Sequence, residues 1–384
     1  MAIHAAYPPS PELLAKLAGT RDADLVGREL VAPDRNRGRG AQTNRSGRFE
    51  RQAREAVDDG WGALETLPPF ETHEHEERAK SIITRNDSPD IGFDRSINPY
   101  RGCEHGCSYC YARPTHTFLG HSAGLDFERE LYAKVNAAEK LREELGHSRY
   151  QAKTIAIGTN TDPYQPIERE RKIMRSLLEV MAETRHPVSI TTKSSLVVRD
   201  LDILTDLAKD GLVNVAISVT TLDAKLARKM EPRASTPVKR LEALELLSAA
   251  GIPTMVNASP MIPAINDMEL EKILAAAASQ GAQAASMILL RLPLEVRDIF
   301  REWLLRHYPD RLSHVMNLVR DTHGGKDYDS RFGTRMSGEG PYAFSLGRRF
   351  EIAVEKYRLK RRLPQLRGDL FVAPKKQDAQ LKLF

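Results

Sequence analysis

From about residue 93 onward, short apolar runs rich in β-branched residues alternate with longer amphipathic stretches. This alternation is typical of repeated βα units that build a parallel sheet. The pattern therefore predicts an α/β protein with six βα units. The expected strands are Phe93–Ile97, Thr154–Gly158, Val188–Thr192, Val213–Val219, Thr254–Ala258 and Ser286–Leu290.

The stretches between these strands carry signals for the beginnings of helices. Asp126 precedes an amphipathic run that continues to Leu145, Thr236–Pro237 precedes a second run, and Asp267 precedes a third. Asp and Thr favour the N-cap, and Pro favours the first helical position. We therefore expect one continuous helix from residue 126 to about 145 and further helices after residues 237 and 267.

Polar residues follow the predicted strands at the ends where loops of a parallel βα protein converge. They are Thr159, Asn160, Thr161 and Asp162 after the second strand, Lys193 and Ser194 after the third, Ser218 in the fourth, Asn257 and Ser259 in the fifth, and Arg291 after the sixth. A ligand-binding site is one interpretation. The other is that each residue caps the helix that follows it.

The charge is unevenly distributed along the 384 residues, whose formal net charge is +5. Residues 28–54 carry eight arginines against three acids, and residues 348–384 carry eleven Lys or Arg against four acids. Basic ends can mark a contact with DNA or RNA. The alternative is that they are solvated flanks.

Three regions follow from this pattern. Residues 1–90 are expected to form a basic, largely irregular arm, disordered or extended, because the stretch 32–54 has too few large apolar residues to offset its ordering entropy. Residues 91–292 hold the βα units, and residues 293–384 form a helical extension with a basic tail. Within it, the Gly-rich loop 327–342 could close an open side of the βα domain, contact phosphates through Arg331 and Arg335, or be a plain surface connection.

Composition favours an ordinary globular protein, with 41% hydrophobic and 28% charged residues. The N-terminus lacks a basic stretch followed by an apolar one, and no apolar run is long enough to span a bilayer. We therefore expect a cytoplasmic protein without a membrane partner.

All three cysteines of the chain, Cys103, Cys107 and Cys110, lie in one eight-residue window. Four-iron clusters normally take four cysteine thiolates. With three, one iron keeps an open position, as a catalytic zinc ion does. The alternatives are a zinc site completed by a histidine (His105, His116 or His121) and three unrelated core cysteines.

This spacing, CxxxCxxC with Tyr109 directly before the last cysteine, resembles the signature of the radical S-adenosylmethionine (SAM) superfamily. The longer run from Asn98 to Arg113 is similar to the branch that contains the spore photoproduct lyases and uncharacterised bacterial relatives. The resemblance implies a partial TIM-type (β/α)6 barrel and a [4Fe-4S] cluster on the three cysteines. It also implies that SAM chelates the fourth iron and is reductively cleaved to a 5′-deoxyadenosyl radical, which abstracts hydrogen from a substrate.

The resemblance also suggests roles for individual residues. Lys193, a compact cation, suits the SAM carboxylate, and Ser218 would lie near the ribose. The turn Thr159–Asp162 would meet the ammonium group, largely through backbone carbonyls. Tyr109 or Tyr111 would lie beside the adenine.

One departure from the lyases concerns the return of hydrogen to the product. The lyases carry a cysteine at the end of the second strand, where this chain has Thr159. Photoproduct repair by the same mechanism is therefore not expected. Tyr164, or recycling of SAM, is a candidate for closing the radical cycle.

The favoured hypothesis is a radical SAM enzyme that receives electrons from a reductant such as flavodoxin or ferredoxin. Its substrate is unknown, and nucleic acid is one candidate. One alternative is an iron-sulfur protein for electron transfer or redox sensing without SAM cleavage. Another is a zinc-dependent nucleic-acid-binding module, which would contain zinc rather than iron and sulfide.

Overall fold

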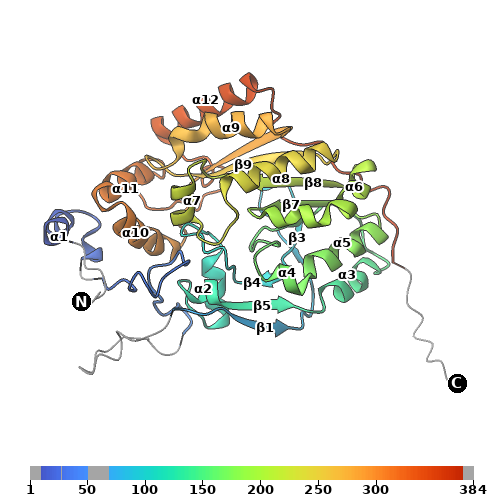
Figure 1. Ribbon diagram of the computed structural model, residues 1–384, viewed down its shortest axis with the longest axis horizontal. Coiled ribbons are helices and arrows are strands. Elements are labelled where there is room, and N and C mark those ends of the chain that lie inside the picture. The colour runs from blue at the N-terminus through green and yellow to red at the C-terminus, as the bar shows by residue number, and fades with distance from the viewer. Residues whose placement is uncertain (1–9, 27, 51–68, 375–384) are drawn as a thin grey trace.

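The computed structural model describes residues 10–26, 28–50 and 69–374 (Figure 1). Six parallel strands occupy its centre, side by side in chain order, and the six predicted strands and the α/β fold class are confirmed. A further strand, β2 (Ile83–Arg85), pairs antiparallel with β3 at one edge. The parallel strands are β3 (Arg95–Ile97), β6 (Ile155–Ile157), β7 (Val188–Thr192), β8 (Val213–Ser218), β9 (Thr254–Met261) and β10 (Ala284–Leu289).

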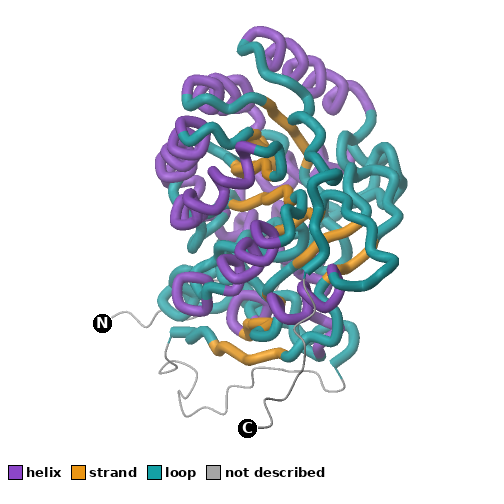
Figure 2. The backbone as a smooth tube through the Cα atoms, turned by 90° about the vertical axis from the view of Figure 1, so that its right-hand side faces the viewer, coloured by secondary structure: helices purple, strands orange, loops and turns teal. Residues whose placement is uncertain are grey.

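Helices lie mainly on one side of the strands, and loops cover the other side (Figure 2). The helices between the strands in the chain are α3 (Ala137–Leu145), α4 (Glu168–Arg171), α5 (Ile173–Glu183), α6 (Leu201–Lys209), α7 (Ala224–Met230), α8 (Pro237–Ala249) and α9 (Leu270–Ser279). Short 3₁₀ segments are η2 (Arg113–Leu119), η3 (Ser195–Asp200) and η4 (Asp267–Glu269). None of the described helices is long and apolar enough to cross a membrane.

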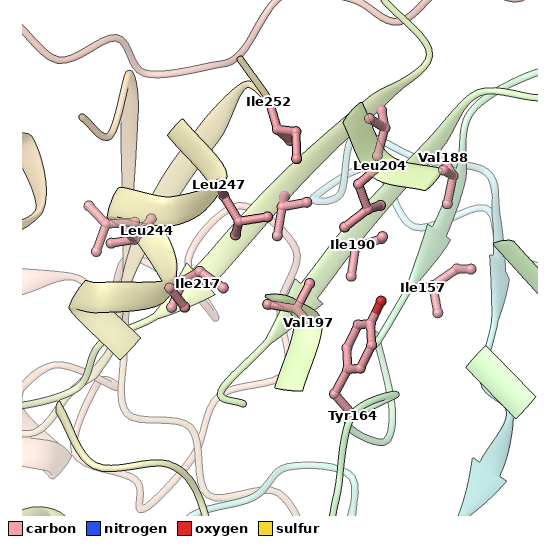
Figure 3. Close-up of a cluster of buried hydrophobic side chains, with 14 of the residues drawn as sticks. Ile157, Tyr164, Val188, Ile190, Val197, Leu204, Ile217, Leu244, Leu247 and Ile252 are labelled. Atoms are coloured by element: carbon pink, nitrogen blue, oxygen red, sulfur yellow. The ribbon is translucent and has the colours of Figure 1, made fainter. Parts of the chain in front are cut away.

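The main hydrophobic core lies between the sheet and these helices (Figure 3). Alternate strand residues such as Val188, Ile190 and Ile217 are fully buried there with Leu204 of α6 and Leu247 of α8. Each such aliphatic side chain stabilises the fold by about 1.5–3 kcal/mol. The β-branched runs in the sequence thus mark the face of each strand that packs against helices.

The predicted helix from residue 126 to 145 is wrong in its middle. The chain forms α2 (Asp126–Arg129), then the strand β5 (Glu130–Lys134), and only then α3. β5 lies between β1 (His73–Glu77), which is parallel to it, and β4 (Tyr100–Arg101), which is antiparallel. Leu131 and Ala133 are buried and alternate with half-buried neighbours. Pairing with two partner strands therefore outweighs the helix propensity of the stretch.

The N-terminal part is better packed than its composition predicted. α1 (Pro11–Ala18) and η1 (Ala23–Leu25) share a core with α10 (Val296–His307) and α11 (Leu312–Asp321). Residues 32–50 form no helix or strand, yet Asn36, Arg39, Ala41, Gln42 and Thr43 are buried. Residues 1–9, 27 and 51–68 of the predicted arm lie outside the described residues.

The C-terminal part runs back across the barrel. After η5 (Pro309–Arg311) and α11, the chain forms α12 (Gly340–Lys356) within the predicted helical extension. The segment that follows passes the amino ends of the strands. Lys360 N donates to Gln283 O (2.8 Å), Arg367 N to Gly211 O (3.0 Å) and Val372 N to Thr184 O (2.8 Å). The described part of the basic tail is therefore attached by backbone hydrogen bonds to the segments at the amino ends of the strands.

Candidate radical SAM site

A cavity of about 220 Å³ lies where the carboxyl ends of the parallel strands converge. The loop that carries the three cysteines (residues 103–111, the cysteine loop) and the ends of β6 to β10 form its walls. Its lining includes the three cysteines and every predicted cofactor-binding residue except Ser194: Tyr109, Tyr111, Thr159, Asn160, Thr161, Asp162, Lys193, Ser218, Asn257, Ser259 and Arg291. Residues that are far apart in the sequence thus meet in one place.

Two candidate residues do not reach this cavity. The hydroxyl of Ser194 accepts a hydrogen bond from Leu196 N (3.2 Å) and caps η3, which was the alternative interpretation of strand-end residues. Tyr164 is buried in the hydrophobic core, where Figure 3 shows it beside Ile157 and Ile190, and its Oη donates to Asp200 (3.1 Å). Tyr164, the candidate for hydrogen return, therefore lies outside the lining of this cavity.

The three thiols lie close enough to interact electrostatically. Burial is the main cause that raises the pKa of Cys103, and it raises the pKa of Cys107 to about 12. Such thiols stay protonated until a metal displaces the proton. Within the described ranges, no three His, Cys, Asp or Glu side chains are grouped tightly enough for one metal ion. A four-iron cluster fits three thiols of wider spacing, because each thiolate binds a different iron.

The N-terminal segment (residues 32–50) contacts the cysteine loop directly. A Cβ at Gly40 would lie 1.6 Å from the carbonyl oxygen of Gly106, so this contact requires glycine. The buried carboxylate of Glu128 accepts hydrogen bonds from Gly40 N (2.9 Å) and Ala41 N (2.8 Å) and also pairs with Arg113. Nε of Arg113 donates to the carbonyl of Cys107 (3.0 Å). Glu128 thus joins the N-terminal segment to the loop that carries the cysteines.

Asp162 organises two of the strand ends. Its carboxylate accepts hydrogen bonds from Thr192 Oγ1 (2.6 Å), Lys193 N (2.7 Å) and Tyr164 N (2.9 Å), and it lies 3.4 Å from His105 Nδ1. Burial acts to raise the pKa of Asp162, but His105 and these hydrogen bonds outweigh it and lower the pKa to about 2. Asp162 therefore holds the turns in place rather than leaving both oxygens open to a ligand.

Asn98 shapes the turn after β6. Its Oδ1 accepts from Asn160 N (2.9 Å) and Thr161 N (3.3 Å), and its Nδ2 donates to Thr159 Oγ1 (3.3 Å). Asn98 thus engages the amide nitrogens of Asn160 and Thr161, and the Tyr111 hydroxyl donates to Thr159 O. The carbonyls of Asn160 and Thr161 are then the ones available to a donor such as an ammonium group.

Lys193 is a cation in the cavity wall. Its Nζ lies 5.9 Å from the ring centre of Tyr109, whose hydroxyl pairs with the buried Glu231. Glu231 also accepts from Thr220 Oγ1 (2.9 Å) and pairs with Arg240. Burial acts to lower the pKa of Lys193, but the attraction of Glu231, and of Cys107 in its thiolate form, outweighs it, and the pKa is raised. Lys193 is therefore positively charged and suited to a carboxylate.

Two polar atoms in the cavity wall have no hydrogen-bond partner among the described residues. They are Ser259 Oγ and Arg291 Nε. The guanidinium of Arg291 lies 5.3 Å from the ring centre of Tyr111 and 6.0 Å from that of Tyr328. Buried polar atoms are normally satisfied. A polar ligand such as SAM would supply the missing partners, so the cavity fits such a group.

Several residues of this site were not predicted from the sequence. Asn98 and Arg113 stand in the motif from residue 98 to 113 but had no assigned role, and His105 was weighed only as a zinc ligand. Glu128 and Glu231 carry no sequence signal that points to the cavity, since both act through long-range contacts.

Comparison with known proteins indicates the family of this chain. Residues 97–277 match the family model of the radical SAM superfamily. The chain is 35% identical over 249 residues to the uncharacterized protein Rv2578c of Mycobacterium tuberculosis, covering 64% of this chain and 73% of the relative. It is 30% identical over 192 residues to the uncharacterized protein MJ0683 of Methanocaldococcus jannaschii, covering 50% of this chain and 69% of the relative.

The fold is similar to a spore photoproduct lyase structure complexed with dinucleoside spore photoproduct. The TM-score is 0.53 at 16% sequence identity, and the alignment covers 74% of this chain and 79% of the lyase. The protein belongs to the radical SAM superfamily. Within it, the chain is related in fold to the spore photoproduct lyases.

Proposed function

We propose that the protein is a radical SAM enzyme whose [4Fe-4S] cluster is held by Cys103, Cys107 and Cys110. The observation that carries this proposal is that these three thiols and the strand-end residues line a single cavity. When bound, the cluster and SAM supply reductive cleavage of SAM and a 5′-deoxyadenosyl radical that abstracts hydrogen from the substrate. The chain supplies ligands, orientation and exclusion of water.

Individual residues take the following roles in the proposal. Lys193 binds the SAM carboxylate as a point charge. Carbonyls of the turn Thr159–Asp162, chiefly those of Asn160 and Thr161, accept from the SAM ammonium group, since Asn98 engages amide nitrogens of this turn and the Tyr111 hydroxyl engages Thr159 O. Ser218 lies near the ribose, and Tyr109 or Tyr111 lies beside the adenine. Asn257, Ser259 and Arg291 complete the polar wall.

The proposal includes a reductant of the flavodoxin or ferredoxin type and a cytoplasmic location, where thiols remain reduced. Hydrogen return by a cysteine is not part of it. The full sequence has three cysteines, all in the cysteine loop, and Thr159 follows β6. The protein is therefore proposed to differ from the lyases in how it closes its radical cycle.

Nucleic acid is the weaker candidate for a substrate. It is supported by the similarity to the lyases and by the basic ends, and several arginines of these ends are engaged within the chain. Arg28 pairs with Glu302 (2.9 Å), Arg48 with Glu295 (2.5 Å) and Arg349 with Glu271 (2.7 Å). In the Gly-rich loop, Arg331 pairs with Asp329 (2.6 Å) and Arg335 with Asp90 (2.6 Å). These five arginines are therefore already paired with carboxylates of the described residues, which weakens their attraction for phosphates.

Anaerobic reconstitution with iron and sulfide, followed by dithionite and SAM, tests the proposal. We expect about four iron atoms per chain, a change in the EPR signal when SAM is added, and formation of 5′-deoxyadenosine. Cys107→Ala should abolish all three. The proposal fails if reconstituted protein neither changes its EPR signal with SAM nor forms 5′-deoxyadenosine, or if zinc alone occupies the site. Binding of DNA and RNA is measured at low and at high salt. If the protein binds neither at any salt concentration, nucleic acid is removed as a substrate.

A further inference from the structure

A buried carboxylate, that of Glu231, lies directly behind the cysteine loop. Only 2% of the residue is exposed, and it is not part of the described lining of the cavity. Its carboxylate pairs with the hydroxyl of Tyr109, which stands between the second and third cysteines. One residue earlier, Met230 O accepts a hydrogen bond from Ser108 N (3.0 Å) in the same loop. Glu231 is therefore held against the cysteine loop through two neighbouring contacts.

The partners of this carboxylate keep it ionised. Besides the tyrosine hydroxyl, Thr220 Oγ1 donates to Oε1 (2.9 Å), and the guanidinium of Arg240 pairs with Oε2. Burial acts to raise the pKa of Glu231, but the attraction of Arg240 and Lys193 and the hydrogen bonds outweigh it, and the pKa is lowered. Glu231 therefore carries a fixed negative charge at the back of the loop.

Two cations lie close to Tyr109 and Glu231. Lys193 Nζ is 5.9 Å from the ring centre of Tyr109, and Arg240, which is 1% exposed, donates to Ser218 O (3.0 Å) in the cavity wall. Reduction adds negative charge to an iron-sulfur cluster, so nearby cations favour the reduced form and a nearby carboxylate disfavours it. Solvent screens such charges little in a buried site. Without Glu231, the charges of Lys193 and Arg240 would act on the cluster without an opposing charge.

Stability alone does not account for the Glu231–Arg240 pair. Two buried charges lose their hydration, and apolar residues of similar volume often replace such a pair without loss of stability. The pair stands where Tyr109 connects it to the cysteines, and a role toward the cluster explains why charges are kept at this place.

We propose that Glu231 is a positioning residue whose negative charge lowers the reduction potential of a cluster on Cys103, Cys107 and Cys110. Tyr109 holds the carboxylate at a fixed place behind the loop. A lower potential favours the reductive cleavage of SAM in the proposed function, on which this inference rests.

Reduction potentials of the reconstituted protein test the proposal, measured without SAM by a titration followed by EPR. Glu231→Gln keeps the shape of the side chain and removes its charge. At a given solution potential we expect the ratio of reduced to oxidised cluster to rise about tenfold, which is a midpoint about 59 mV higher for one electron. Glu231→Gln combined with Arg240→Gln removes two opposite charges, so its potential should return close to that of the wild type.

Glu168→Gln is the matched control. Glu168 is also a buried carboxylate that pairs with a tyrosine hydroxyl and an arginine, those of Tyr100 and Arg199. Tyr100 is not part of the described lining of the cavity. The potential of Glu168→Gln should therefore equal that of the wild type.

The proposal is overturned if Glu231→Gln has the potential of the wild type. It is also overturned if the double variant is shifted as far as Glu231→Gln, because altered geometry rather than charge would then be the cause. The double variant leaves no uncompensated buried charge, so it should fold and hold the cluster. If Glu231→Gln holds no cluster while Glu168→Gln does, Glu231 serves the assembly of the cysteine loop, and the proposal is overturned as well.

The same measurements separate this proposal from the proposed function. A wild-type protein that cleaves SAM, with equal potentials in all variants, contradicts the role of Glu231 alone. A wild-type protein whose cluster responds to Glu231→Gln as expected but never forms 5′-deoxyadenosine contradicts the proposed function alone. A wild-type protein that holds no four-iron cluster contradicts both.

Discussion

Arg335 and Asp90 join opposite edges of the half barrel. Nε of Arg335 donates to Asp90 Oδ2 at 2.6 Å, and Gly333 N donates to Asp90 Oδ1 at 2.8 Å. Asp90 follows β2 at one edge of the seven-stranded sheet, whereas Met336 O accepts from Leu289 N of β10 at the other edge. The Gly-rich loop predicted from the sequence therefore closes the open side of the barrel.

Breaking this contact should open the loop without unfolding the barrel. In Asp90→Asn the partly buried Arg335 loses its counter-ion, which costs about 1.5–3 kcal/mol locally. We expect amide hydrogen exchange to accelerate in residues 86–94 and 331–338, with little change in the core strands. Asp87→Asn, in the same segment, is the control. Equal exchange in the wild type and Asp90→Asn would show that the contact does not hold the loop.

A second prediction concerns the contact between the N-terminal segment and the cysteine loop. Gly40→Ala places a methyl group 1.6 Å from Gly106 O, so one backbone must move away. Overpacking of this kind costs at least about 1–3 kcal/mol. We expect the iron and sulfide content after reconstitution to fall by more than half. Gly19→Ala is the control, because a Cβ at Gly19 would have no atom within 4 Å. Full cluster content in Gly40→Ala would contradict this role of the segment.

This contact shows what the sequence could and could not predict. Runs such as Val188–Thr192 have a local β-branched pattern, and the structure has strands there. Gly40 and Glu128 are 88 residues apart, and neither their contact nor its effect on the cysteine loop has a local signal. The same holds for β5, whose residues favour a helix locally. It becomes a strand through pairing with β1, a run of histidine and glutamate without an apolar pattern.

The position of the candidate site could also be predicted from the sequence, but the orientation of individual side chains could not. Its position followed from a general rule, that parallel strands present their carboxyl ends to one cavity, and this rule placed Lys193 and Ser218 together. The rule does not say which side chains point into the cavity. Ser194 does not point into the cavity because its hydroxyl caps η3. Tyr164 does not because its ring packs in the core and its hydroxyl donates to Asp200.

Removing the cation at the end of β7 should weaken SAM binding. Lys193→Met keeps much of the length of the side chain but has no charge to pair with the SAM carboxylate. Losing a charge-assisted hydrogen bond of about 1.5–3 kcal/mol corresponds to an increase of roughly 10- to 100-fold in the dissociation constant. Equilibrium dialysis with reconstituted protein measures it. Lys209→Met, on the exposed face of α6, is the control. If Lys193→Met binds SAM with unchanged affinity, another group binds the SAM carboxylate.

A final prediction concerns the stability of the fold in mild acid. His186 is fully buried, its Nδ1 faces Pro187 O (3.0 Å) and its Nε2 faces the Tyr150 hydroxyl (2.8 Å). Burial is the main cause that lowers its pKa from 6.5 to about 4. Between these two values the unfolded chain binds a proton that the folded chain does not. The stability that this group contributes is therefore complete above pH 6.5 and is lost as the pH falls toward 4.

The loss from His186 alone amounts to about 3 kcal/mol at full extent. Denaturant unfolding at several pH values between 7 and 4 should show a free energy of unfolding that decreases with falling pH. His186→Gln should lower the stability at pH 7 and flatten this dependence, with His314→Gln on α11 as the control for removing an exposed histidine. If the pH dependence of His186→Gln matched that of the wild type, the buried imidazole would not be the group that titrates on unfolding.

Since Tyr150 and Phe371 pack around the ring, the same protonation would also loosen the C-terminal segment from the sheet. Faster hydrogen exchange near Val372 at pH 5 than at pH 7, after correction for the intrinsic rate, is the local measure of this effect.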